Sequence, residues 1–143
     1  MTGFTACRRR LQFANVNIAM TETDTVSVPK EKWVRLMADH SSTGIWLSDG
    51  TMAEPDEFPV SSHLHARIET WCGWYERDQN YLFPHERTTD FDYKAFSAEG
   101  LAIAHAIKAE LSDWTVFYFD EATYHETAEN TVKPRIVFEY EIR

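Results

Sequence analysis

Two successive patterns of hydrophobic residues predict a helix followed by a strand in the second half of the chain. Between residues 97 and 111, apolar and small residues recur at spacings of three and four, which mark one face of a helix. The expected N-cap is Ser97. The next stretch, residues 114–119 (WTVFYF), is aromatic and β-branched, which is typical of a strand. Because both faces of that strand carry large side chains, we expect it in the middle of a sheet, with the helix covering one face. The helix face is formed by Gly100, Ile103, Ala104, Ile107 and Leu111.

Shorter patterns on either side of this pair predict three further strands and a second helix. Residues 32–39 alternate in polarity, and residues 45–47 continue after the turn residues HSSTG, so these two stretches predict a β-hairpin. A helix should then begin at Ser61 or Ser62, with Gly73 packed closely against a neighbour. Residues 120–134 form a polar connection, and the alternation in residues 135–143 predicts a strand antiparallel to the central one. The apolar face of the second helix comprises Leu64, Ile68, Trp71, Cys72 and Tyr75.

The resulting order, strand–strand–helix–helix–strand–strand, predicts an α+β fold. We expect an antiparallel sheet of about four strands, with two main helices packed on one face. Residues 28–143 form a single α+β domain in this interpretation, and residues 1–27 form a flexible leader. The alternative for the leader is an extra edge strand around residues 11–18.

Composition restricts the class of protein. The chain is 43% hydrophobic, which favours a globular protein over a disordered one. It holds no apolar run of about 20 residues, so no transmembrane helix and no membrane partner are expected. The stretch after Arg8, Arg9 and Arg10 is too polar for a signal peptide, and Cys7 and Cys72 make no disulfide framework. These features predict a cytoplasmic protein.

Charge argues against direct nucleic-acid binding. The chain carries 14 basic and 23 acidic residues, for a net charge of −9. Three of the basic residues are Arg8, Arg9 and Arg10, so the remainder is more acidic still. A phosphate backbone would meet a surface of its own sign.

The sequence contains no established catalytic motif, no metal-ligand pattern and no cofactor-binding loop. His63 and His65 point to different faces of the predicted helix, which disfavours a shared metal ion. A lone cysteine on an apolar face, as at Cys72, is usually a buried small hydrophobe, and His105 is interpreted as a surface or half-buried histidine. A second class of function remains open, because His125 lies beside carboxylates and a small enzyme with a dispersed His/Glu site would need such a cluster.

Acidic residues with aromatic neighbours suit a basic protein partner. Carboxylates raise the rate of encounter with a cationic surface, and aromatic side chains supply most of the binding energy in many interfaces. Acidic residues with aromatic neighbours concentrate in three stretches, residues 54–57, 86–92 and 120–129, and the neighbours of the second stretch include Tyr81 and Phe83. The candidate partner-binding residues lie in or next to the first and the third stretch. They comprise Glu54, Asp56, Glu57, Phe58, Asp120, Glu121, Tyr124 and Glu126.

A small acidic α+β protein with no active-site motif is similar in type to the immunity proteins of bacterial toxin–immunity systems. That resemblance implies a protein that binds and blocks a cognate toxin, often a basic nuclease. The alternative on the same charge argument is a nucleic-acid-mimicking inhibitor of a DNA- or RNA-binding enzyme. We rank it second because Arg and Lys interrupt the acidic residues.

Overall fold

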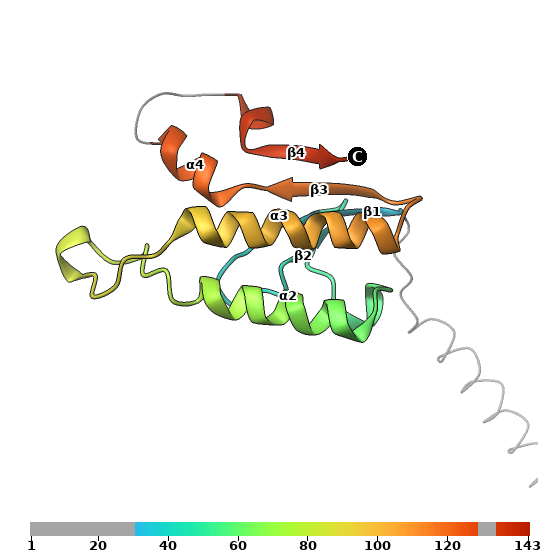
Figure 1. Cartoon of the computed structure of the whole chain (residues 1–143), viewed down its shortest axis with the longest axis horizontal. Helices are drawn as coiled ribbons and strands as arrows, with labels where there is room; N and C mark the ends of the chain where they lie inside the picture. Colours follow the sequence, from blue (N-terminus) through green and yellow to red (C-terminus); the bar gives the residue numbers. More distant parts are fainter. Residues whose placement is uncertain (1–30, 129–133) are drawn as a thin grey trace, which may run out of the picture.

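The structure is a computed structural model that describes residues 31–128 and 134–143. The predicted leader, its alternative strand and Cys7 lie outside these residues. One sheet, three helices and three short 3-10 turns make up the described part of the chain (Figure 1). No helix in residues 31–128 or 134–143 is long and apolar enough to cross a membrane. The elements are β1 (Trp33–Leu36), β2 (Ile45–Leu47), η1 (Pro55–Glu57), α2 (Ser62–Tyr75), η2 (Pro84–Glu86), α3 (Tyr93–Glu110), β3 (Thr115–Phe119), α4 (Glu121–Ala128), η3 (Arg135–Val137) and β4 (Glu139–Ile142).

The four strands lie in the order β2-β1-β3-β4, and the sheet is mixed. The β1–β2 and β3–β4 pairs are antiparallel, as predicted, but β1 and β3 are parallel, with Val34 opposite Val116. The α+β class is therefore confirmed, whereas the prediction of an antiparallel sheet is wrong. The reason lies in the long connection, because α2 and α3 together return the chain to the start of β1. Parallel neighbours require such a crossover.

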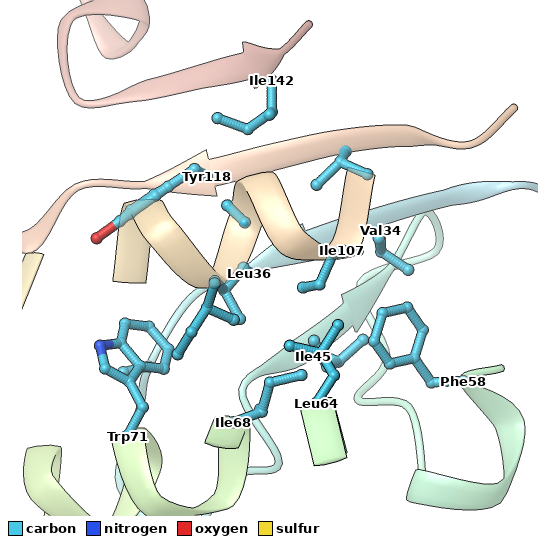
Figure 2. Packing of buried hydrophobic residues seen from close by; sticks show 14 of the residues in the cluster. Val34, Leu36, Ile45, Phe58, Leu64, Ile68, Trp71, Ile107, Tyr118 and Ile142 are labelled. Carbon is cyan, nitrogen blue, oxygen red and sulfur yellow. The ribbon is translucent and has the colours of Figure 1, made fainter. Parts of the chain in front are cut away.

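Helices α2 and α3 cover one face of the sheet, and the core lies between these two helices and the sheet (Figures 1 and 2). Alternate residues of the central strands point into it, so Val34, Leu36, Val116 and Tyr118 are fully buried. On the opposite face, half-buried Arg35 lies 3.2 Å from a carboxylate oxygen of Glu139. Strand β3, which was predicted from residues 114–119, is thus a central strand with β1 on one side and β4 on the other. Its two apolar faces indicated this position.

Gly100 allows the aromatic side chains of the core to approach α3. Trp71 of α2 stacks on Phe96 at a centroid distance of 4.6 Å, and its indole N–H donates to the Phe96 carbonyl at 3.0 Å. A Cβ atom on Gly100 would stand 2.6 Å from the Trp71 ring and would also meet the Tyr118 hydroxyl. Gly73 differs, because no atom lies within 4 Å of a Cβ placed there. The prediction that Gly73 packs closely is wrong.

Two boundaries differ from the predicted ones. Helix α3 begins at Tyr93, and its N-cap is Asp92, whose carboxylate accepts from the Ala95 amide at 2.9 Å. Ser97 is instead buried inside the helix, where its hydroxyl accepts from the Ala122 amide at 2.9 Å. That hydrogen bond joins α3 to α4.

Helix α4 lies in the stretch predicted as a polar connection, and the order of elements is therefore β-β-α-α-β-α-β. The Asp120 carboxylate accepts from the Thr123 amide at 3.1 Å, and Glu121 occupies the first turn. An acidic residue in the first turn suits the helix dipole. The predicted last strand also starts later than expected, because residues 135–137 form η3.

Candidate functional site

The carboxyl edge of the sheet, defined here as the edge at which β1 and β3 end, brings together four segments of the chain. Because β1 and β3 are parallel, the chain leaves both strands at this edge, and β4 begins there opposite Phe119. Helix α4 follows β3 directly. The loop between α2 and α3 reaches the same end of the molecule (Figure 1). The carboxyl ends of parallel strands are where open α/β sheets commonly place ligand sites.

A histidine–carboxylate network lies at this edge and is centred on Asp78. His40, from the loop after β1, places its Nε2 atom 3.2 Å from Asp78 and its Nδ1 atom 3.3 Å from Glu76. The buried Asp78 carboxylate also accepts from the Asn80 amide at 3.0 Å and from the Tyr93 hydroxyl at 3.3 Å. The network therefore ties the loop after β1 to the end of α2 and to the start of α3.

His125 extends the network into α4. Its Nε2 atom lies 3.3 Å from the Glu121 carboxylate and 3.2 Å from the side-chain amide nitrogen of Asn80, and its ring packs on Tyr93 at 4.1 Å. Burial raises the pKa of Glu121, and the charge of Asp78 adds to this rise. The prediction that His125 lies among carboxylates at one end of the sheet is confirmed for Glu121.

These contacts suit a structural role for the network. Burial raises the pKa of the Tyr93 phenol, which therefore stays protonated and donates to Asp78 at neutral pH. A hollow of about 260 Å³ lies beside His125 and Asn80. In the part of the chain that the structure describes, no group of three His, Cys, Asp or Glu residues is arranged to hold a metal ion. What the network does is fix the loop after α2 and helix α4 in place.

Exposed large hydrophobic residues lie on several segments at the same end of the molecule as this network. The exposed large hydrophobic residues of the described segments all fall at the carboxyl edge, on the loop after α2, on α4 and on η3. Tyr81 and Phe83 are 71% and 69% exposed. Exposed apolar clusters of this kind mark interaction sites more often than ordinary surface. The set comprises Tyr81, Phe83, Tyr124, Ile136 and Val137.

The first predicted acidic segment lies at the other end of the sheet. Glu54, Asp56 and Glu57 belong to η1 and its N-cap, and Phe58 packs on Trp114, which precedes β3. Asp120 follows β3, whose five residues span about 17 Å. The two predicted acidic segments therefore do not form one surface.

Burial separates the predicted partner-binding residues further. Phe58 is 2% exposed and Glu121 is 4% exposed, so neither side chain offers a surface to a partner. Asp120 is half-buried and caps α4, whereas Tyr124 and Glu126 are exposed. Partner binding by the exposed members stays a prediction.

The remaining cysteine and histidine candidates lie on the two long helices, α2 and α3. Cys72 is buried, and burial raises the pKa of its thiol to about 12, so the thiol is not activated. His63 and His65 both lie on α2, and His65 contacts the Phe58 carbonyl oxygen at 2.8 Å. His105 is exposed on α3.

Sequence reasoning missed the network, and it noted Tyr81 and Phe83 beside the acidic stretch 86–92 without including them among the candidate partner-binding residues. Tyr81 and Phe83 interrupt a polar loop without helical or strand periodicity, and that signal was available. No sequence signal joins His40 to Asp78, because the two residues belong to separate elements that only the fold brings together.

Comparison with known families decides the class of protein. A family model described as "Serratia CdiI immunity protein-like" matches residues 32–121, which is more than half of the chain. The chain belongs to this family. A search of curated proteins found no match.

Membership of the immunity protein-like family confirms, at a coarse level, the prediction of an immunity-type toxin inhibitor. The matched residues run from β1 to the first residue of α4, and they include Tyr81 and Phe83. The exposed residues Tyr124, Ile136 and Val137 lie beyond the match. The basic character of the partner stays a prediction.

Proposed function

We propose that this immunity-type protein binds and neutralises a basic toxin domain in the bacterial cytoplasm, using its carboxyl edge. The observation that carries the proposal is the concentration of exposed large hydrophobic residues at that edge. Aromatic residues dominate the energetics of many protein interfaces, and Tyr is among the most enriched. No cofactor is part of this function.

Charge at the carboxyl edge favours a cationic partner. Glu76, Glu86 and Glu126 are exposed at the end of α2, on the loop after α2 and on α4, and that loop and α4 also carry Tyr81, Phe83 and Tyr124. Exposed carboxylates steer a basic protein toward the surface and raise the association rate, an effect that salt screens. The same charges disfavour a phosphate backbone as the ligand.

The network beneath the surface supports the proposal energetically. Asp78 and Asn80 hold the loop after α2, and His125 links that loop to α4. A surface that is fixed before binding loses less conformational freedom on association, which raises affinity. The buried carboxylates thus act as positioning groups for the exposed residues.

The alternative functions have weaker support. A nucleic-acid mimic needs continuous rows of carboxylates, whereas exposed Arg77, Arg87 and Lys94 interrupt the acidic residues near the carboxyl edge. An enzyme would use the hollow beside His125. The Nε2 atom of His125 already contacts Asn80 and Glu121, which suits a structural role for this histidine. Both alternatives stay predictions.

The experiment that tests the proposed function is a growth-protection assay. The cognate toxin domain is expressed from an inducible promoter, with or without the chain. We expect growth arrest by the toxin alone and restored growth when the two are produced together. Continued arrest, with both proteins soluble at comparable levels, would contradict the function.

A pair of charge reversals tests which end of the molecule binds. Glu126 at the carboxyl edge and Asp56 in η1 are both exposed carboxylates. Glu126→Lys should weaken binding of the toxin domain by roughly two- to tenfold, mainly through a slower association rate. Asp56→Lys should leave the rate unchanged, and surface plasmon resonance at low and high salt measures both. A larger effect of Asp56→Lys would place the interface at η1.

A further inference from the structure

We infer that the aromatic loop, defined here as residues 79–88, is a preformed anchor that inserts Tyr81 and Phe83 into an apolar pocket of the toxin rimmed by basic residues. This inference rests on the proposed function and names the part of the carboxyl edge that carries the binding energy. It also states the chemistry of the site on the partner.

The two rings of the aromatic loop are presented to solvent from a short stretch of chain. Tyr81 is 71% exposed and Phe83 is 69% exposed, while Leu82 between them is half-buried. The Tyr81 ring meets His40 edge-on at 5.7 Å, and the Phe83 ring stacks on His85 at 5.9 Å. Each ring therefore has one neighbour that orients it and a large face left for a partner.

Hydrogen bonds within the aromatic loop fix its shape. The Gln79 side chain closes the base, since its oxygen accepts from the Thr88 amide at 2.8 Å and its nitrogen donates to the Thr88 hydroxyl at 3.0 Å. The Phe83 amide donates to the Glu86 carboxylate at 3.0 Å. The Arg87 guanidinium donates to the Leu82 carbonyl at 3.2 Å.

The base of the aromatic loop is also conformationally specific. Gln79 has a positive φ of 56°, a left-handed conformation that few non-glycine residues adopt. The adjacent Asn80 is held by the buried Asp78 carboxylate and contacts His125. Contacts on both sides thus hold this conformation, as expected of a loop that is ordered before it binds.

The charges around the two rings define the rim of the partner's pocket. Two exposed carboxylates lie beside the rings, because Glu86 accepts from the Phe83 amide and Glu76 lies 3.3 Å from His40, whose ring meets Tyr81. Arg87 donates to the Leu82 carbonyl of the same loop. A pocket that accepts two aromatic rings must be apolar in its interior, and cations at its rim would meet these carboxylates. Anchors of this kind owe their energy to desolvation within such a pocket.

The remaining exposed apolar residues are less suited to serve as the anchor. The Tyr124 ring already packs on Phe119 and Phe138, at 5.3 Å from each. Ile136 and Val137 belong to η3, outside the residues matched by the family model. These residues form a good internal control, since they are exposed, apolar and at the same edge.

The test compares two double variants for binding to the purified cognate toxin domain. Tyr81→Ser/Phe83→Ser removes both rings, and Ile136→Ser/Val137→Ser removes two exposed apolar side chains from η3. We expect the first to lower affinity by about 100-fold or more, as for hot-spot residues, and the second by about threefold or less. Isothermal titration calorimetry provides the affinities, and thermal melting checks that both variants are folded.

The outcomes separate the inference from the function on which it rests. If the chain with both rings binds and Tyr81→Ser/Phe83→Ser binds equally well, the anchor is wrong and the proposed function stands. Equal losses in both double variants also overturn the anchor. If the unaltered chain fails to bind, the proposed function itself is contradicted.

Gln79→Ala tests whether the anchor is preformed, because it keeps both rings but opens the base of the loop. A binding loss of roughly three- to tenfold is expected for a preformed anchor. Full affinity would contradict preformation.

Discussion

Gly100 and Gly73 show how the same residue type has opposite effects in neighbouring helices. Gly100 lies on the buried face of α3, where the Trp71 ring and the Tyr118 hydroxyl occupy the space that a methyl group would need. Gly73 is exposed on α2, with open space around it. The first glycine therefore serves packing, whereas the second weakens its helix without a packing benefit.

The same substitution at the two glycines should shift stability in opposite directions. Gly100→Ala should lower the free energy of unfolding by about 1–3 kcal/mol, because the core must move to admit the methyl group. Gly73→Ala should raise it by up to about 1 kcal/mol, through helix propensity alone. Urea denaturation followed by circular dichroism measures both. A stabilising Gly100→Ala would show that the packing of Trp71 is misassigned.

Glu121 should make stability depend on pH. Its pKa is raised in the folded protein, mainly by burial, so the folded state holds its proton more tightly than the unfolded chain does. The stability linked to this proton is fully present at low pH and is lost as the pH rises through the folded-state pKa. At neutral pH the fold therefore bears the cost of a buried carboxylate.

Glu121→Gln should consequently be more stable than the unaltered protein at pH 7, and the difference should shrink as the pH is lowered. Urea midpoints between pH 4 and pH 8 measure the difference, with exposed Glu126→Gln as the control. A pH-independent difference for Glu121→Gln would contradict this interpretation of Glu121.

At the scale of elements, the Asp78 network joins the loop after β1, the loop after α2 and the start of α3. The aromatic loop depends on Asp78 at its base, where the carboxylate receives hydrogen bonds from Asn80 and Tyr93. Removing one partner of a buried hydrogen-bonded set leaves other polar groups unsatisfied, which costs about 1–3 kcal/mol.

Asp78→Ala should therefore destabilise the fold and loosen the aromatic loop. We expect faster amide hydrogen exchange in residues 79–88 and a loss of roughly 1–3 kcal/mol in the free energy of unfolding. Asp90→Ala, an exposed carboxylate of the segment that joins α2 and α3, is the matched control and should have little effect. Equal exchange rates in the two variants would mean that the network does not order the loop.

The elements that the sequence predicted correctly are those determined by local patterns. The β1–β2 hairpin, the central position of β3 and the Ser61 cap of α2 follow from alternation, composition and capping chemistry. Helix α4 was missed because its apolar periodicity is weak, although Asp120 followed by Glu121 is an N-cap signal. The parallel β1–β3 pair was missed because strand direction depends on the path of two helices, which no local pattern records.

The candidate site was predicted only in part, and for a physical reason. Acidic and aromatic residues are visible in the sequence, but burial is a property of the fold. Phe58 and Glu121 are covered by the packing of other elements, while Tyr81 and Phe83 are left exposed. The network of His40 with Asp78 depends on the tertiary path of the chain and leaves no local signature.

For the whole molecule, the two ends of the sheet differ in character. The end near Trp114 and Phe58 is closed by buried aromatic contact. The carboxyl edge combines a buried polar network with exposed aromatic and acidic residues. An immunity-type protein that blocks a basic toxin needs a rigid, acidic and partly apolar surface, and the carboxyl edge meets that description.

Hydrogen–deuterium exchange of the chain alone and in complex with the cognate toxin domain tests the carboxyl edge most directly. Binding at this edge should slow exchange in residues 76–92 and 120–126 and leave residues 54–58 unchanged. Protection confined to η1, or to the exposed side of α2 and α3, would contradict the assignment of the carboxyl edge as the toxin-binding surface.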